Sequence, residues 1–180
     1  MKNLHCFLLL LVVNLLSPGT VQMQSLSELD FHRVTLPNGW GITPVGTSLS
    51  LGDLPLNMVV SPSGKILAVT NNGQSDQTLQ LIDIKTRKVL DTVIVGKAFI
   101  GLAFSSDSKT LYASGGNDNW ILKYDVSKGK FKLTGKIVID KPWPVKVCPA
   151  GIALDDKQGL LYVVTTENNS LYLLDTKSEK

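Results

Sequence analysis

The sequence repeats one unit three times, and this repetition constrains the fold more than any other feature. The copies read MVVSPSGKILAVTNNG from Met58, LAFSSDSKTLYASGGN from Leu102 and IALDDKQGLLYVVTTEN from Ile152. A leucine inside each copy recurs after 44 and then 50 positions, at Leu67, Leu111 and Leu161. A period in the forties made of short strand-like runs is typical of a β-propeller, in which each repeat forms one four-stranded blade.

Each repeat predicts four strands, because short apolar runs alternate with turns that contain proline, glycine and asparagine. In the first repeat the strands are expected near residues 56–60, 65–70, 78–83 and 89–95. The later repeats predict strands near residues 101–104, 110–114, 120–125 and 132–139, and then 151–154, 160–165 and 170–175. The segment 140–149, DKPWPVKVCP, is expected to be an extended loop because it holds three prolines. The fold class is therefore all-β: a partial β-propeller of about three four-stranded antiparallel blades, near residues 54–96, 97–140 and 147–180.

The predicted blades are too few to close a propeller. Propellers usually have at least four blades, and about three are present in these 180 residues, the third without a fourth strand. We therefore expect a fragment of a longer protein, or a chain that associates with a protein partner or with itself through open sheet edges. The run Thr47–Leu51 alternates like a strand, and in a closed propeller such an N-terminal strand commonly completes the last blade.

The N-terminal residues 1–24 are interpreted as a signal peptide. Lys2 precedes an apolar run of about ten residues, Phe7–Leu16, and a Ser-Pro-Gly end. This run is too short to cross a bilayer of about 30 Å as a helix, so we expect export with no membrane anchor after removal of the leader. Residues 25–52 then form a leader segment and residues 53–180 the propeller. The formal net charge of +3 is too small to indicate nucleic-acid binding.

Two elements carry a resemblance to a known family. LAVTNNG at Leu67–Gly73 and LYVVTT at Leu161–Thr166, each between a turn and a strand that ends in aspartate, resemble the YVTN β-propeller repeats of YncE-like proteins, which are WD40-like. The leader VTLPNGWGITPVG at Val34–Gly46, followed by LGDLPLNM, is similar to the entry of the N-terminal propeller of bacterial YncE-like/phosphoesterase fusion proteins. This resemblance implies a periplasmic or extracellular bacterial protein, and a phosphoesterase domain beyond residue 180.

The sequence contains few residues or motifs that are typical of catalytic sites. The two histidines are His5 and His32, and no G-x-S-x-G turn or phosphate-binding glycine loop occurs. After removal of the leader, one histidine and Cys148 cannot supply a Cys/His metal site. Three aspartates recur once per repeat and are interpreted as turn and strand-end hydrogen-bonding groups: Asp83, Asp125 and Asp175. We predict no catalytic residue, metal or cofactor in this chain.

The candidate binding residues lie in loops. Loops that join second to third strands, and loops that join one blade to the next, open on the same face of a propeller. Those loops hold the candidates Asn72, Lys97, Asn117, Asp118, Asn119 and Trp143. Amides, a lysine and a tryptophan on one face would suit a small polar or anionic ligand. The alternative is that the asparagines serve tight turns with positive φ, and that Trp143 packs against the blades.

The sequence thus favours an exported binding or scaffold module that is not catalytic by itself. One alternative is part of a propeller hydrolase of the lactonase type, which would need additional blades with unlike acidic residues at the channel. Another is part of a phosphoesterase whose catalytic domain lies beyond residue 180. A third is a partial propeller that a second copy completes.

Overall fold

The structure is a computed structural model that describes residues 33–43 and 46–179. The chain divides into two compact units, Met1–Ser48 and Leu49–Lys180. The predicted signal peptide, residues 1–24, lies outside the described residues. Within the described ranges, no helix has the length and apolar character that crossing a membrane requires.

The first unit contains a small antiparallel hairpin of β1 (Val34–Thr35) and β2 (Gly41–Ile42). Its turn is held by the backbone N–H of Leu36, which donates to the carbonyl of Trp40 at 2.7 Å. Gly39 has a φ of 82°, a left-handed conformation that costs glycine little and most other residues more. The Asn-Gly pair in the leader therefore marks a local hairpin.

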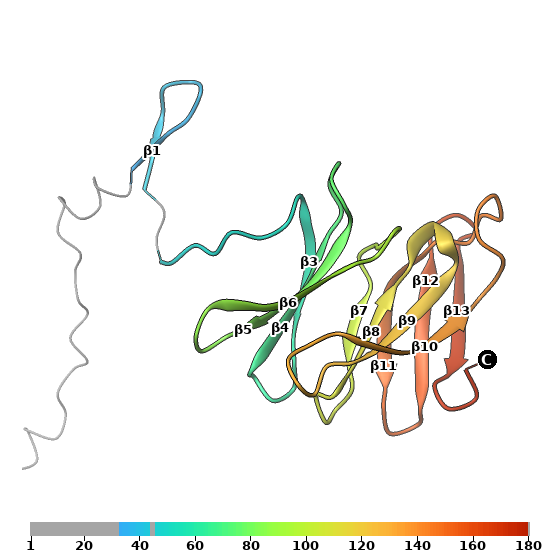
Figure 1. The fold of residues 1–180 in the computed structure, drawn as a ribbon. Helices are drawn as coiled ribbons and strands as arrows, with labels where there is room; N and C mark the ends of the chain where they lie inside the picture. The colour runs from blue at the N-terminus through green and yellow to red at the C-terminus, as the bar shows by residue number, and fades with distance from the viewer. Residues whose placement is uncertain (1–32, 44–45, 180) are drawn as a thin grey trace, which may run out of the picture. The chain divides into compact units, whose positions relative to one another are not determined.

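The second unit consists of three antiparallel sheets side by side (Figure 1), and this confirms the predicted all-β propeller architecture. Blade 1 has four strands: β3 (Pro55–Val60), β4 (Ile66–Asn71), β5 (Thr78–Asp83) and β6 (Lys88–Ile94). Blade 2 has β7 (Leu102–Phe104), β8 (Thr110–Ser114), the 3₁₀ turn η1 (Gly116–Asp118), β9 (Trp120–Asp125) and β10 (Lys132–Val138). Blade 3 has β11 (Pro149–Asp155), β12 (Leu160–Thr165) and β13 (Ser170–Asp175).

Strand order follows chain order in every blade, from an inner strand to an outer one. The inner strands are neighbours, since β7 contacts both β3 and β11. All strand bounds match the expected ones within two residues, and the largest difference is at β11, which begins at Pro149, two residues earlier than expected. Residues 47–51 belong to none of the sheets that the structure describes, so their closing role stays a prediction.

Blades 1 and 2 share an apolar core. The side chains that meet are Ala68, Leu79 and Leu81 from blade 1 and Leu102, Leu111, Ala113, Leu122 and Tyr124 from blade 2. Tyr124 also packs edge-to-face against Phe131, with ring centroids 5.3 Å apart. Alternate residues of β4 and β5 supply one face of this core, as the period of two along a strand requires.

Blades 2 and 3 share a second core, built from the other face of blade 2. Here Tyr112, Ile121 and Ile137 pack against Leu161, Val163 and Leu174. Among the described residues, blade 2 is therefore covered on both faces, while blades 1 and 3 are each covered on one. The burial of the three repeated leucines reflects this difference. Leu111 and Leu161 are 0% exposed, whereas Leu67 is only half-buried.

The three recurring aspartates close turns between or after strands, as predicted. Asp83, Asp125 and Asp175 accept hydrogen bonds from the backbone N–H groups of Thr86 at 2.6 Å, Ser127 at 2.9 Å and Ser178 at 2.6 Å. These N–H donors are the main reason that the pKa of each aspartate lies below the ordinary value of 3.8. The carboxylates therefore have a structural role in the turns.

These aspartates predict a loss of stability in acid. A carboxyl group whose folded pKa is lowered stabilises the fold above its unfolded pKa, and this contribution disappears as the pH falls through the folded pKa. We expect the free energy of unfolding in urea to fall as the pH drops below about 4. The triple change of Asp83, Asp125 and Asp175 to asparagine should reduce this fall, whereas Asp76→Asn, in an exposed loop, should not. An identical pH dependence in the triple variant would contradict the assignment.

Candidate functional site

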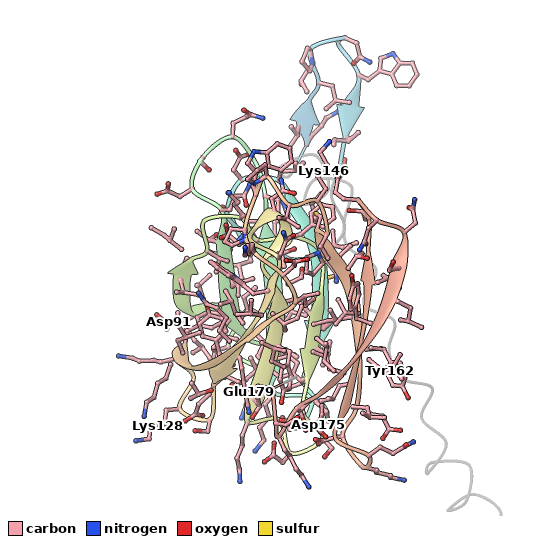
Figure 2. All side chains as sticks on the ribbon, turned by 90° about the vertical axis from the view of Figure 1, so that its right-hand side faces the viewer. Asp91, Lys128, Lys146, Tyr162, Asp175 and Glu179 are labelled. Carbon is pink, nitrogen blue, oxygen red and sulfur yellow. The ribbon has the colours of Figure 1, made fainter. Side chains whose placement is uncertain are left out.

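The loops on one face of the blades form the candidate site. Figure 2 shows Lys146, from the loop before β11, at the opposite end of the blades from Lys128 and Asp175. The loops from β4 to β5, β8 to β9 and β12 to β13 end on the side of Lys146, and so do the connections between blades. The sequence prediction that these two sets of loops share a face follows from this topology.

A pocket of about 360 Å³ lies among these loops, and we call it the loop-face pocket. All three blades contribute to it, because its walls come from the inner strand β3, both connections between blades and the three second-to-third-strand loops. The lining residues are Leu56, Asn72, Gln77, Lys97, Ala98, Phe99, Gly116, Asn117, Cys148, Thr166 and Glu167. Three of the six predicted binding residues therefore meet in one hollow: Asn72, Lys97 and Asn117.

Two buried oxygen atoms at this pocket have no hydrogen-bond donor among the described residues. They are Oδ1 of Asn72 and Oε1 of Gln77. The orientation of the Asn72 amide is set by its Nδ2, which donates to the carbonyl of Ala98. A buried acceptor without a partner costs about 1–3 kcal/mol, so each of these two lining residues carries an oxygen that a hydrogen-bond donor would stabilise.

Charge at the pocket is balanced. The Nζ atom of Lys97 lies 3.4 Å from Oδ1 of Asp118, and the two side chains are 45% and 21% exposed. Asp118 itself does not line the pocket, so its contribution is to hold Lys97. Glu167 adds a carboxylate to the lining. The polar side chains of the lining are thus the amides of Asn72, Gln77 and Asn117, the hydroxyl of Thr166, the carboxylate of Glu167 and the ammonium group of Lys97.

Asn119 lies behind the pocket and is completely buried. Its Nδ2 donates to the carbonyls of Lys141 at 2.6 Å and Val145 at 2.7 Å, and its Oδ1 accepts from the N–H of Cys148 at 2.8 Å. Its φ of 57° is left-handed, a conformation that asparagine tolerates better than most residues. This side chain holds the proline-rich loop 140–148 against blade 2, and its bonds go to that loop.

Trp143 lies in the same proline-rich loop but does not line the loop-face pocket. Its side chain is 54% exposed. The Nζ atom of Lys146 lies 5.6 Å from the centre of the ring, within the range of a cation–π contact. The expected alternative of packing against the blades does not describe this residue, because more than half of it faces solvent.

Gln77, Phe99, Cys148 and Glu167 also line the pocket, and no pattern in the sequence distinguishes them as binding residues. Cys148 is a buried free thiol. Gln77 immediately precedes β5, and Glu167 follows β12 by two positions, so both occupy loop positions equivalent to the predicted ones. Among the described residues, no three His, Cys, Asp or Glu side chains gather as a metal site would require.

Comparison with known proteins places the fold among β-propellers. Hydrazine synthase of Kuenenia stuttgartiensis matches with a TM-score of 0.59 and 20% identity, over 76% of this chain and 37% of that one. The WD40 repeats of RRP9 match with a TM-score of 0.59 and 14% identity, over 73% and 38%. The β-propeller domain of Cps50 (Swd1) from Myceliophteria thermophila matches with a TM-score of 0.57 and 14% identity, over 74% and 39%.

The chain thus spans less than two fifths of each of these solved structures. No family model matches the sequence, and no curated protein does. Identities of this size carry the fold and nothing about ligands or reactions.

Proposed function

We propose that the chain is an exported, YncE-like propeller module that binds a small polar ligand at the loop-face pocket and is not catalytic by itself. The propeller fold supports a binding or scaffold role, because propellers present loops from several blades on one rigid face. The resemblance of Leu67–Gly73 and Leu161–Thr166 to YVTN repeats supports the family, and the apolar N-terminal run supports export. The observation that carries the binding site is the pair of buried acceptors, Asn72 Oδ1 and Gln77 Oε1.

The acceptors favour one class of ligand. A molecule with N–H or O–H groups satisfies Asn72 and Gln77, and a positively charged amine also pairs with Glu167. An anion would meet the carboxylate of Glu167, and Lys97, which also lines the pocket, is already paired with Asp118. Of the two classes that the sequence suggested, polar and anionic, the pocket favours the polar one.

The test compares three probes by NMR, using backbone amide shifts of the protein: ethanolamine, glucose and acetate. We expect ethanolamine or glucose to shift the signals of Lys97, Asn117 and Glu167, and acetate to shift them least. Replacing Gln77 by alanine removes one acceptor and should weaken binding of the responsive probe by about tenfold. The same change should leave the free energy of unfolding unchanged or slightly higher, because the lost oxygen has no donor in the unliganded protein.

Gln158→Ala is the matched control, because Gln158 is exposed in the turn after β11, at the other end of the blades. It should leave both probe binding and the pocket signals unchanged. A stronger response to acetate than to ethanolamine and glucose would contradict the ligand class. No response at the pocket to any of the three would contradict the site.

A protein partner is the second part of the proposal. The outward faces of blades 1 and 3 expose large apolar side chains: Met58 and Val60 on β3, Val164 on β12, and Leu171 and Leu173 on β13. Exposed apolar residues grouped on one face of a sheet typically mark an interaction site. We propose that a protein partner, or a second copy of the chain, covers these faces.

A further inference from the structure

The proline-rich loop 140–148 presents a tryptophan directly beside the loop-face pocket. The backbone N–H of Trp143 donates to the carbonyl of Asn117 at 3.0 Å, and Asn117 lines the pocket. Cys148, the last residue of the same loop, lines the pocket as well. The loop joins blade 2 to blade 3, and the structure describes strands of both blades. The 54% exposure of the Trp143 side chain is therefore a property of the loop between two neighbouring blades.

The conformation of this loop is restrained by hydrogen bonds and by proline. The N–H of Val145 donates to the carbonyl of Pro142 at 3.3 Å, which places Trp143 in a tight four-residue turn. Two residues of that turn, Pro142 and Pro144, have φ restricted to about −65°. The buried side chain of Asn119 binds the loop at three backbone positions. An ordered loop loses little conformational entropy when a ligand binds, so Trp143 offers a preorganised surface.

Trp143 contributes to neither of the two apolar cores that the described residues form. Trp120, by contrast, is partly buried against the core between blades 1 and 2. A large aromatic side chain stabilises a fold mainly through burial, so the blades gain little from a tryptophan at position 143. An aromatic ring next to a polar pocket is typical of a ligand site, in which apolar surface supplies affinity and polar groups fix orientation.

The charges around the ring disfavour ionic ligands. The Nζ atom of Lys146 lies 5.6 Å from the centre of the Trp143 ring, and Figure 2 shows Lys146 at this end of the blades. A cation stacked on the ring would be repelled by this ammonium group, and an anion would meet the carboxylate of Glu167 in the pocket. A neutral ligand avoids both repulsions.

The size of the pocket indicates how far a ligand extends. Its volume of about 360 Å³ is near the lower limit of ligand sites, which is about 300 Å³. A ligand longer than one ring therefore continues out of the pocket and over the neighbouring loops. Trp143 lies on such a path, because its backbone is bonded to Asn117 in the lining.

We propose that the loop-face pocket and Trp143 together bind a neutral carbohydrate chain, with one sugar ring in the pocket and the next ring stacked on Trp143. This inference rests on the proposed ligand pocket and names the class of its ligand. A pyranose ring carries hydroxyl groups around its rim and C–H groups on its faces. The hydroxyl groups suit the amide and carboxylate side chains of the lining, and a C–H face suits the indole ring.

The dependence of affinity on ligand length tests the inference. Glucose, maltose and cellobiose are titrated into the full chain, and binding is followed by NMR. We expect at least one disaccharide to bind about five- to tenfold more tightly than glucose, because its second ring packs on the indole. The same disaccharide should shift the indole N–H signal of Trp143, which is identified by its absence from the spectrum of Trp143→Ala. Equal affinities for glucose and both disaccharides would overturn the inference.

Variants of the tryptophan separate stacking from a general effect on the protein. Trp143→Ala should reduce disaccharide affinity to that of glucose, whereas Trp143→Phe should keep part of the gain because it retains an aromatic ring. The urea midpoint of Trp143→Ala should stay that of the parent, because the side chain is exposed. Trp40→Ala is the matched control: Trp40 is 72% exposed in the turn between β1 and β2, and its loss should leave the gain intact. A similar loss of the gain in both alanine variants would contradict stacking on Trp143.

The outcomes also separate this inference from the proposed ligand pocket. If ethanolamine or glucose shifts the amide signals of Asn117 and Glu167 but neither disaccharide gains affinity through Trp143, the carbohydrate chain is wrong and the polar pocket stands. If none of the probes shifts these signals, both proposals fail. Binding of a disaccharide that Trp143→Ala leaves unchanged would keep the pocket and exclude the tryptophan from the site.

Discussion

Replacing Asn119 by alanine is expected to lower the free energy of unfolding by about 3–5 kcal/mol, because three buried hydrogen bonds disappear together. The carbonyls of Lys141 and Val145 lose their donor, and the N–H of Cys148 loses its acceptor. Cys148 is buried, so water replaces this last bond poorly. Urea unfolding of the variant and the parent measures the loss.

Asn169→Ala is the control that isolates the backbone contribution. Asn169 has a φ of 51°, close to the 57° of Asn119, but its side chain is exposed in the turn before β13. We expect this change to cost about 1 kcal/mol, the price of a left-handed alanine. The difference between the two variants then reports the buried bonds. Equal losses would show that the side chain of Asn119 contributes no more than its backbone conformation.

Truncating the repeated leucines should give unequal losses although the sequence context is similar. Leu111→Ala and Leu161→Ala each remove a side chain that is 0% exposed between two blades, so each should cost about 2–5 kcal/mol. Leu67 is half-buried on the open face of blade 1, and Leu67→Ala should cost about 1 kcal/mol. The three variants are compared by urea unfolding at protein concentrations where the chain is monomeric.

The losses in free energy of unfolding for the three leucine variants also show whether the open face of blade 1 is covered. If Leu67→Ala costs as much as Leu111→Ala in the monomer, something within the same chain covers blade 1, and the face is not available to a partner. A cost for Leu67→Ala that grows with protein concentration is the result that partner binding requires, because association then buries the same side chain.

Much of the fold could be predicted from the sequence because its signals are local. Alternating apolar residues define each strand, and residues such as Gly64 in a turn and Asp83 at the end of β5 mark where strands stop. The bounds of β5, β8, β9, β12 and β13 agree with the expected ranges. The end of the proline-rich loop was placed less well, because Pro149 opens β11 where a proline is tolerated, at the first residue of a strand.

The candidate site could be predicted only in part. Topology brings the loops of Asn72, Lys97 and Asn117 to one face, and that much follows from the repeat. Asn117 and Asn119 lie two positions apart in one loop, yet the first lines the pocket and the second is buried behind it. The η1 turn at Gly116–Asp118 directs the side chains of Asn117 and Asn119 to different places. The direction of each side chain cannot be predicted from a glycine-rich sequence, because several turn conformations are open to it.

Adjacent blades are joined by hydrogen bonds, and the short sequence distance between the bonded residues affects how the chain can fold during its synthesis. Hydrogen bonds between blades join residues about one repeat apart: Asn57 to Ile100, Ser63 to Ser108 and Ser106 to Asp156 are separated by 43, 45 and 50 positions. During synthesis each blade can therefore dock on the one before it as soon as a single further repeat has emerged. A gene for such a chain can lengthen by duplicating one repeat, because the new blade needs only the surface of its predecessor.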